Sequence, residues 1–121
     1  MAKILIIDDD SAIRRLITRI LGSAGHDVIE ASGGKLGLEM FSAERPSIII
    51  VDILMPDTDG IETIRSIVSA HSSVGIIAIS GGGIGSSKFY LDMATKLGAH
   101  RYLEKPFTKA ELVSTVDSLL P

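Results

Sequence analysis

Four short apolar runs constrain the fold of this 121-residue chain most, because each stops at a polar side chain. Residues 4–7 and 48–51 are only isoleucine, leucine and valine, and residues 74–79 are apolar throughout. Unbroken apolar runs of this length are typical of strands buried on both faces of a parallel sheet. The polar ends of the four runs are Asp8-Asp9, Asp52, Ser80 and, after the short pair Tyr102-Leu103, Glu104-Lys105. We therefore predict a parallel sheet whose carboxyl edge gathers carboxylates, a hydroxyl and an ammonium.

Amphipathic segments alternate with these runs. Ser11 is a suitable helix cap, and apolar residues follow it at positions 13, 16, 17, 20 and 21, which form one face of a helix. Arg14 falls on the polar side, where a solvated position is the default. The remaining predicted elements are a strand over 28–31, a helix that ends before Pro46, a helix over 61–68, a helix over 87–97, a strand over 100–104 and a last helix over 112–120.

This alternation predicts five βα units and an α/β fold. Right-handed crossovers favour a doubly wound sheet in the order 2-1-3-4-5, with helices on both faces. In such folds the ligand site lies beyond the carboxyl ends of the strands, where the strand order reverses. The first and third strands flank that point, so we expect Asp8, Asp9 and Asp52 to lie together there.

Composition narrows the class of protein. The chain is 45% hydrophobic and 22% charged, which is typical of one globular domain, here residues 1–121. A net charge of −3 disfavours direct nucleic-acid binding. The absence of cysteine excludes disulfides and thiolate metal sites. We find no signal-peptide pattern and no apolar stretch long enough to span a membrane, so a cytoplasmic protein is expected.

The residues expected at the sheet edge can handle a phosphoryl group. Clustered carboxylates repel one another unless a cation joins them, and oxygen ligands with room for water suit Mg²⁺. An aspartate at a strand end can attack phosphorus and form an aspartyl-phosphate. Phosphoryl transfer depends mostly on positioning and charge neutralisation, for which a metal, the Lys105 ammonium and the Ser80 hydroxyl are suitable.

Taken together in order and spacing, these motifs resemble those of a response-regulator receiver domain of two-component signalling, a single flavodoxin-like domain of the chemotaxis type. The resemblance covers essentially the whole chain. The matching segments are residues 6–9, residues 51–56, Asp59-Gly60, residues 79–81, Gly98-Ala99 and residues 102–107.

The resemblance implies a phosphoacceptor and a metal site. Asp52 would take a phosphoryl group from a histidine kinase or a histidine phosphotransfer protein. Asp9 and Asp52 would bind Mg²⁺ directly, the main-chain carbonyl of Leu54 would be a third ligand, and Asp8 would act mainly through water. These expectations belong to the family pattern, and the sequence carries every residue that they need.

The resemblance also implies a switch. Lys105 would pair with the phosphoryl group and Ser80 would hydrogen-bond to it after a small shift. Tyr102 matches the aromatic switch position, and the Lys105-Pro106 peptide bond would be cis. The expected readout surface is the helix over 87–97, the strand over 100–104 and the last helix. We expect no effector domain in this chain, so output would pass through a protein partner. The sequence leaves open whether phosphorylation also causes homodimerisation.

Two further features bear on the resemblance. The interval between Ser80 and Lys105 is a few residues longer than usual, with the surplus placed in the glycine-rich residues 81–85. The resemblance implies that the side chains two places after Asp52 and after Ser80 influence water attack on the phosphoryl group, and here these are the apolar Leu54 and Gly82, which has no side chain to orient water. We therefore expect slow self-dephosphorylation and, besides self-phosphorylation, no other enzymatic activity.

Two alternatives stay open. One is a small magnesium-dependent phosphohydrolase of the haloacid dehalogenase type, because Asp8-Asp9-Asp10 contains an Asp-x-Asp pattern. That family expects a threonine where this chain has Ala12, and the reading leaves Asp52 unexplained. The other is a binding module of receiver fold that is not phosphorylated, which the intact acidic, hydroxyl and lysine set argues against.

Overall fold

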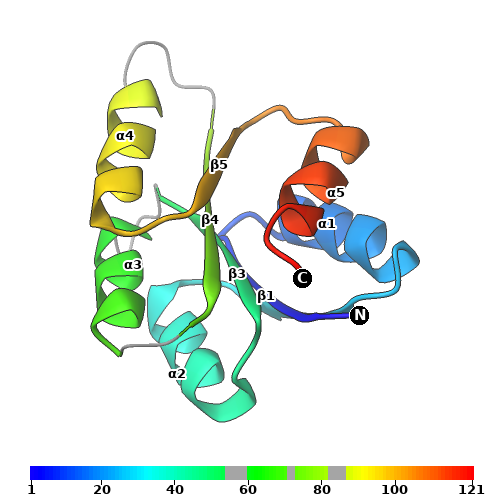
Figure 1. Ribbon diagram of the computed structural model, residues 1–121, viewed down its shortest axis with the longest axis horizontal. Helices are drawn as coiled ribbons and strands as arrows, with labels where there is room; N and C mark the ends of the chain where they lie inside the picture. Colours follow the sequence, from blue (N-terminus) through cyan, green and yellow to red (C-terminus); the bar gives the residue numbers. More distant parts are fainter. Residues whose placement is uncertain (54–59, 71–72, 82–86) are drawn as a thin grey trace.

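A computed structural model of the chain describes residues 1–53, 60–70, 73–81 and 87–121, with side chains from residue 92 onward in the last range. Five strands form one sheet, and every pairing between neighbours is parallel. The strand order is β2-β1-β3-β4-β5, as predicted (Figure 1). The strands are β1 Lys3–Ile7, β2 Asp27–Ala31, β3 Ile48–Asp52, β4 Gly75–Ser80 and β5 Arg101–Glu104.

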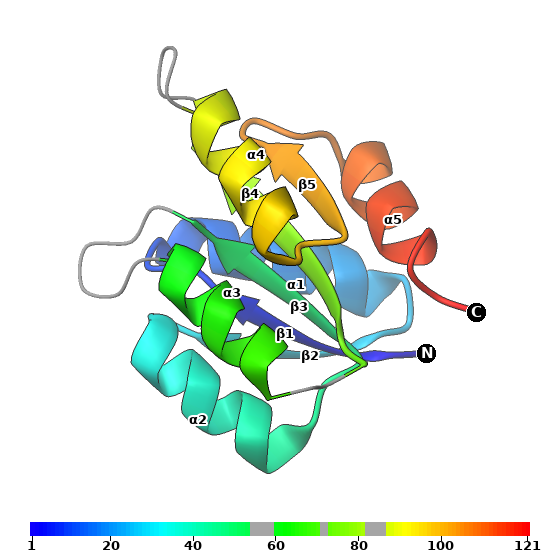
Figure 2. The same ribbon diagram turned by 60° about the vertical axis from the view of Figure 1, so that its left-hand side comes forward.

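Helices cover both faces of this sheet. Helices α1 and α5 lie on one face and α2, α3 and α4 on the other (Figures 1 and 2). Their bounds are α1 Ser11–Ser23, α2 Gly34–Glu44, α3 Gly60–Ser69, α4 Ser87–Leu97 and α5 Lys109–Asp117. Among the described residues, none of these helices has the length and apolar character required to cross a bilayer.

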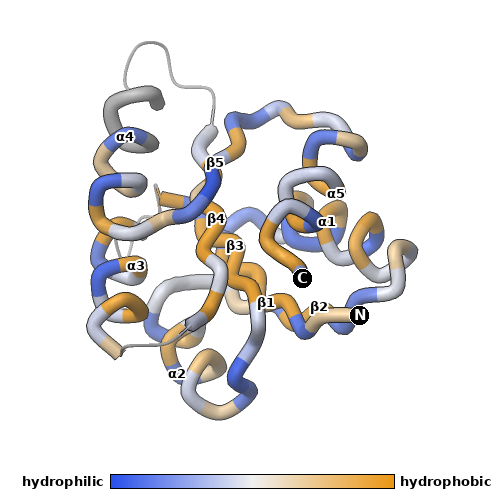
Figure 3. The backbone as a smooth tube through the Cα atoms, viewed as in Figure 1, coloured by the Kyte–Doolittle hydropathy of each residue, from blue (hydrophilic) through white to orange (hydrophobic). Residues whose placement is uncertain are grey.

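The apolar runs lie in the middle layer, where the tube in Figure 3 is most strongly hydrophobic. Successive strand side chains point to opposite faces. Leu5 and Ile7 accordingly pack with α3 residues such as Ile64, whereas Ile4 and Ile6 pack on the side of α1 and α5. Both faces of the sheet are covered, so neither set of positions tolerates a polar side chain, which explains the unbroken runs.

The start of α1 differs from the prediction. Asp10, not Ser11, is the N-cap, and its carboxylate accepts hydrogen bonds from the amides of Ala12 and Ile13. The amide of Asp10 donates to Asp8 Oδ1 at 2.8 Å, which helps to hold residue 10 in the extended conformation that a cap requires. Ser11 becomes the first helical residue.

Two histidines accept main-chain hydrogen bonds at the amino-terminal ends of the edge strands β2 and β5. His26 Nδ1 accepts a hydrogen bond from the amide of Ala2 at 3.1 Å, just before β2. His100 Nδ1 accepts one from the amide of Ile76 at 3.0 Å, just before β5. A main-chain hydrogen bond returns to the same residue in each case, from the amide of Asp27 to the carbonyl of Ala2 and from the amide of His100 to the carbonyl of Ile76.

Candidate functional site

Three aspartates meet where β1 and β3 end, at the edge toward which both arrows point in Figure 2. Ile7 of β1 pairs with Val51 of β3, so the residues that follow them, Asp8 and Asp52, are neighbours. One carboxylate oxygen from each of Asp8, Asp9 and Asp52 lies within 4.8 Å of the other two. Asp8 has no exposed surface, Asp52 is only 4% exposed, and Asp9 is exposed. The structure therefore brings together the three side chains that the sequence placed at one edge.

Lys105 is the cation of this cluster. It follows β5, yet its Nζ lies 3.0 Å from Asp8 Oδ2 and 3.6 Å from Asp52 Oδ2. Burial lowers the pKa of Lys105, but the hydrogen bond that Lys105 donates to Asp8 and the negative charges of Asp52 and Asp8 outweigh burial, so the pKa is raised above the ordinary value. Lys105 is therefore charged at neutral pH and contacts both buried carboxylates at once.

Ser80 ends β4 next to these groups. It is fully buried, and its Oγ donates a hydrogen bond to the carbonyl of Gly81 at 3.3 Å. The main-chain carbonyl of Ser80 accepts from the amide of Lys105 at 2.8 Å, which joins the two residues through the backbone. The next peptide bond, Lys105-Pro106, is cis. The hydroxyl and the ammonium thus lie at the ends of adjacent strands.

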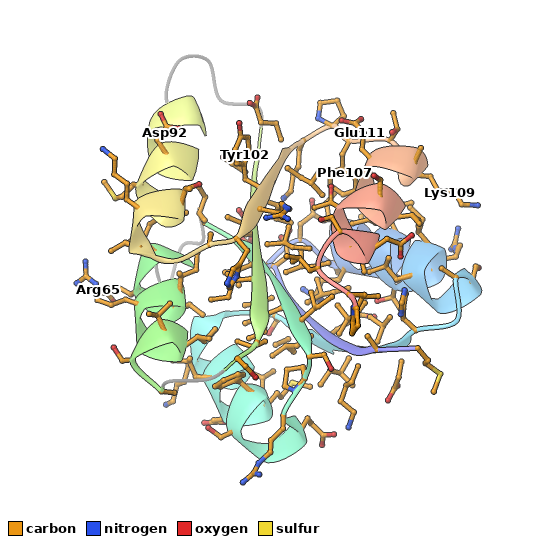
Figure 4. All side chains as sticks on the ribbon, in the orientation of Figure 1. Arg65, Asp92, Tyr102, Phe107, Lys109 and Glu111 are labelled. Carbon is orange, nitrogen blue, oxygen red and sulfur yellow. The ribbon has the colours of Figure 1, made fainter. Side chains whose placement is uncertain are left out.

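The other predicted site residues are placed only in part. Tyr102 lies on β5 between α4 and α5 and is 51% exposed (Figure 4). This position belongs to the expected readout face. Leu54 and Gly82, which the family resemblance links to metal binding and to phosphoryl lifetime, lie outside the described residues, as does most of the glycine-rich run.

Arg14 belongs to this region, although its position predicted a solvated side chain. Its Nη1 donates to the main-chain carbonyl of Asp8 at 2.6 Å, and its Nε lies 3.2 Å from Glu30 Oε1. The other carboxylate oxygen of Glu30 accepts from the hydroxyl of Thr18 at 2.8 Å. The Arg14 side chain is only 17% exposed. No sequence signal pairs Arg14 with Glu30, because they lie on different elements.

Gly60 allows the start of α3 to lie against the end of β3. A Cβ at this first residue of α3 would overlap the carbonyl oxygen of Asp52 and the Cα of Ile53. The start of α3 can therefore approach the end of β3 this closely only if residue 60 has no side chain.

A hollow of about 980 Å³ lies at the opposite, amino-terminal end of the sheet. Phe41, Pro46 and Leu119 line it together with Arg45, and no Asp or Glu is among its described lining residues. Its chemistry does not suit a cation or phosphoryl transfer, so the acidic edge is the candidate site.

We expect Gly60→Ala to destabilise the protein by about 1 to 3 kcal/mol, because the new methyl group must displace backbone next to Asp52. Gly22→Ala in α1 is the matched control. A Cβ there meets nothing within 4 Å, so the change should stabilise the helix by about 0.5 to 1 kcal/mol. Urea unfolding of both variants measures the difference, and equal stability of the two would contradict the close approach at residue 60.

The raised pKa of Lys105 predicts a pH dependence of stability. The ion pairs should stabilise the fold fully below pH 10.5, the ordinary lysine value, and lose this effect as pH rises through the higher folded pKa. Lys105→Met should therefore cost about 1 to 3 kcal/mol at neutral pH. Its deficit should shrink above pH 10.5.

Lys109→Met is the control for this experiment, since Lys109 is exposed on α5 (Figure 4). The unfolding free energies of wild type, Lys105→Met and Lys109→Met are compared in metal-free buffer from neutral pH to above pH 10.5. A Lys105→Met deficit that stayed constant at high pH would show that the ion pairs are not its cause.

Comparisons with known proteins identify the family. Residues 4–117 match the family model described as the response regulator receiver domain. The chain is 35% identical over 118 residues to the probable transcriptional regulator ycf27 of Porphyridium aerugineum, covering 98% of this chain and 48% of that protein. It is 31% identical to the response regulator MprA of Mycolicibacterium vanbaalenii, with 98% and 50% covered. The chain thus spans about half the length of the curated relatives it matches.

Solved structures agree in fold. The receiver domain of NtrX from Brucella abortus superimposes with a TM-score of 0.90 at 28% identity, with 97% of each chain covered. The chemotaxis response regulator CheY4 of Vibrio cholerae gives a TM-score of 0.87 at 29% identity, with 99% of each chain covered. This chain therefore belongs to the family of response regulator receiver domains of two-component systems.

Proposed function

We propose that this chain is the phosphoacceptor switch of a two-component phosphorelay, with Asp52 as the residue that takes the phosphoryl group. One observation carries the proposal. The Asp52 carboxylate is nearly buried, lies 3.6 Å from the Lys105 ammonium, and shares an edge with two further carboxylates. A carboxylate with a purely structural role does not require a lysine and two further carboxylates beside it. A phosphoryl acceptor requires charge neutralisation on several sides.

The donor set fits Mg²⁺. Three carboxylates face one lysine in the described part of the cluster, so negative charge remains that a divalent cation would balance. All the available ligands are hard oxygen atoms, and the exposure of Asp9 leaves room for metal-bound water. Asp9 and Asp52 would hold the ion directly with the carbonyl of Leu54, and Asp8 would act through water. When bound, the metal would supply charge neutralisation for the transferred phosphoryl group.

The proposed transfer is a single displacement at phosphorus. A carboxylate oxygen of Asp52 forms a bond to phosphorus while the bond to the donor histidine nitrogen breaks, and that nitrogen keeps the electron pair. Asp52 needs no general base, because the carboxylate is already ionised when it attacks. Lys105 would pair with a phosphoryl oxygen, which its distance from Asp52 allows after a small movement.

The proposed switch uses the residues that adjoin this group. Ser80 Oγ now donates to the carbonyl of Gly81 and would turn to the phosphoryl group. Tyr102, which is exposed on β5, would change rotamer as Ser80 moves. The outcome is a change in the surface of α4, β5 and α5, which a protein partner would read. The domain would exchange between two conformations. Phosphorylation would favour one of them only to the extent that the phosphoryl group interacts more favourably with that conformation than with the other.

The rivals explain less of the geometry. A haloacid dehalogenase-type hydrolase would use the first strand's aspartates as nucleophile and acid, but Asp8 is fully buried and bonded to Lys105. A binding module that is not phosphorylated would have no use for Lys105 between two carboxylates. We propose a cytoplasmic signalling protein whose catalysis is limited to its own phosphorylation and slow dephosphorylation.

Asp52→Asn tests this function. Wild type should bind beryllofluoride in the presence of Mg²⁺, and a small phosphoryl donor should give one stable phosphoryl label per chain, because Asp52 is the acceptor. Asp52→Asn should lose both responses while keeping its fold. We would measure the label by mass spectrometry and beryllofluoride binding by ¹⁹F NMR. An equal response in the variant would reject Asp52 as the acceptor, and turnover of small phosphate esters would favour the hydrolase.

The lifetime of the phosphorylated form is a separate prediction. Leu54 and Gly82 carry no polar side chain, so no group at these positions orients water toward the phosphoryl group. We expect loss of the label from isolated phosphoprotein over many minutes, and faster loss in Leu54→Asn, where an amide can orient a water. Radiolabel decay after removal of the donor measures both rates. A half-life of seconds in the wild type would contradict the expectation.

A further inference from the structure

Arg14 is the one basic side chain in the described part of α1 that reaches the backbone of the acidic loop. Its guanidinium donates to the carbonyl of Asp8 at 2.6 Å, and Glu30 of β2 holds the same guanidinium from the other side at 3.2 Å. Thr18, one turn further along α1, donates to Glu30 at 2.8 Å. This chain of contacts links two elements, α1 and β2, to the end of β1.

The carbonyl of Asp8 belongs to the peptide group that joins Asp8 to Asp9. A peptide group is planar, so the carbonyl of one residue and the amide of the next turn together. A hydrogen bond that fixes the carbonyl of Asp8 therefore fixes the direction in which the chain enters Asp9. The amide of Asp8 is also held, by the carbonyl of Ala31 at 3.2 Å.

Asp9 needs such support. Asp8 is held by Lys105 and the amide of Asp10, and Asp10 caps α1. Asp9 lies between them and is exposed, yet one of its carboxylate oxygens stays within 4.8 Å of the buried pair. The orientation of the Asp9 backbone determines the direction of its Cβ and therefore which positions its carboxylate can reach.

We infer that Arg14, anchored by Glu30 and Thr18, is a positioning residue for the metal site. It fixes the Asp8-Asp9 peptide group and so directs the Asp9 carboxylate toward the cation. This inference rests on the proposed function, because it concerns the Mg²⁺ affinity of the same site. Outer-shell partners of metal ligands commonly change metal affinity by about 10-fold to 100-fold when removed.

Simple electrostatics predicts the opposite result, which makes the inference testable. Arg14 is a positive charge near a cation site, so its removal alone would strengthen Mg²⁺ binding. If Arg14 positions Asp9, its removal weakens binding instead. The sign of the change in Kd therefore separates the two effects.

The experiment compares Arg14→Met, Arg14→Lys and Arg15→Met with the wild type in calorimetric titrations of metal-free protein with Mg²⁺. Arg15 is the matched control, since it is the next residue of α1, is exposed, and among the described residues donates its side-chain hydrogen bond to the hydroxyl of Ser11 at 3.5 Å. Arg14→Met should raise the Kd about tenfold. Arg15→Met should leave it unchanged or slightly lower, and Arg14→Lys should recover part of the affinity because an ammonium can also donate to the carbonyl of Asp8.

A second readout needs no metal. In metal-free protein, Arg14→Met should shift the NMR signal of the Asp9 amide and speed its hydrogen exchange, whereas Arg15→Met should not. Thermal unfolding checks that each variant is folded. A Kd for Arg14→Met equal to or below that of wild type, or an unchanged Asp9 amide, would overturn the inference. Failure of the wild type itself to bind Mg²⁺ would instead reject the proposed metal site, and the inference with it.

Discussion

The carboxylate of Asp8 has no exposed surface, so the protein rather than water must stabilise its charge. Its two oxygens accept hydrogen bonds from the Lys105 ammonium and from the amide of Asp10. Its carbonyl accepts from Arg14, and its amide donates to Ala31 of β2. The hydrogen bonds of this one buried charged residue thus tie together β1, the start of α1, β2 and the loop after β5, at the edge of the sheet where the three aspartates meet.

The fold was predictable because its signal is local and repeated. Strands that are buried on both faces are apolar along their length, and the residues that follow them at the site are polar. Each apolar run and its polar end could therefore be recognised without reference to the other runs. The positions of Asp8, Asp9 and Asp52 followed from the order of the strands. Ser80 and Lys105 followed in the same way from the next two strands, at the same edge of the sheet.

What the sequence missed depends on contacts between elements. Asp10 and Ser11 are equally good caps by residue type, and the hydrogen bond from the amide of Asp10 to Asp8 decides between them. Arg14 could not be separated from a solvated arginine, because its partner Glu30 lies on β2. His26 and His100 were missed for the same reason, since each accepts from an amide 24 residues away.

The burial of Asp8 also bears on why a metal and a switch would occupy one site. Lys105 now serves two carboxylates, at 3.0 Å from Asp8 and 3.6 Å from Asp52. A phosphoryl group on Asp52 would add roughly two negative charges at that residue. These charges would draw the Lys105 ammonium toward Asp52. The buried Asp8 carboxylate would then lose part of the positive charge that balances it. Binding of another cation beside Asp8 would therefore become more favourable as Lys105 moves. Since the amide of Lys105 donates to the carbonyl of Ser80, that movement would also act on the ends of β4 and β5. Charge balance at Asp8 would thereby couple metal binding to a displacement of the strands at the proposed readout surface.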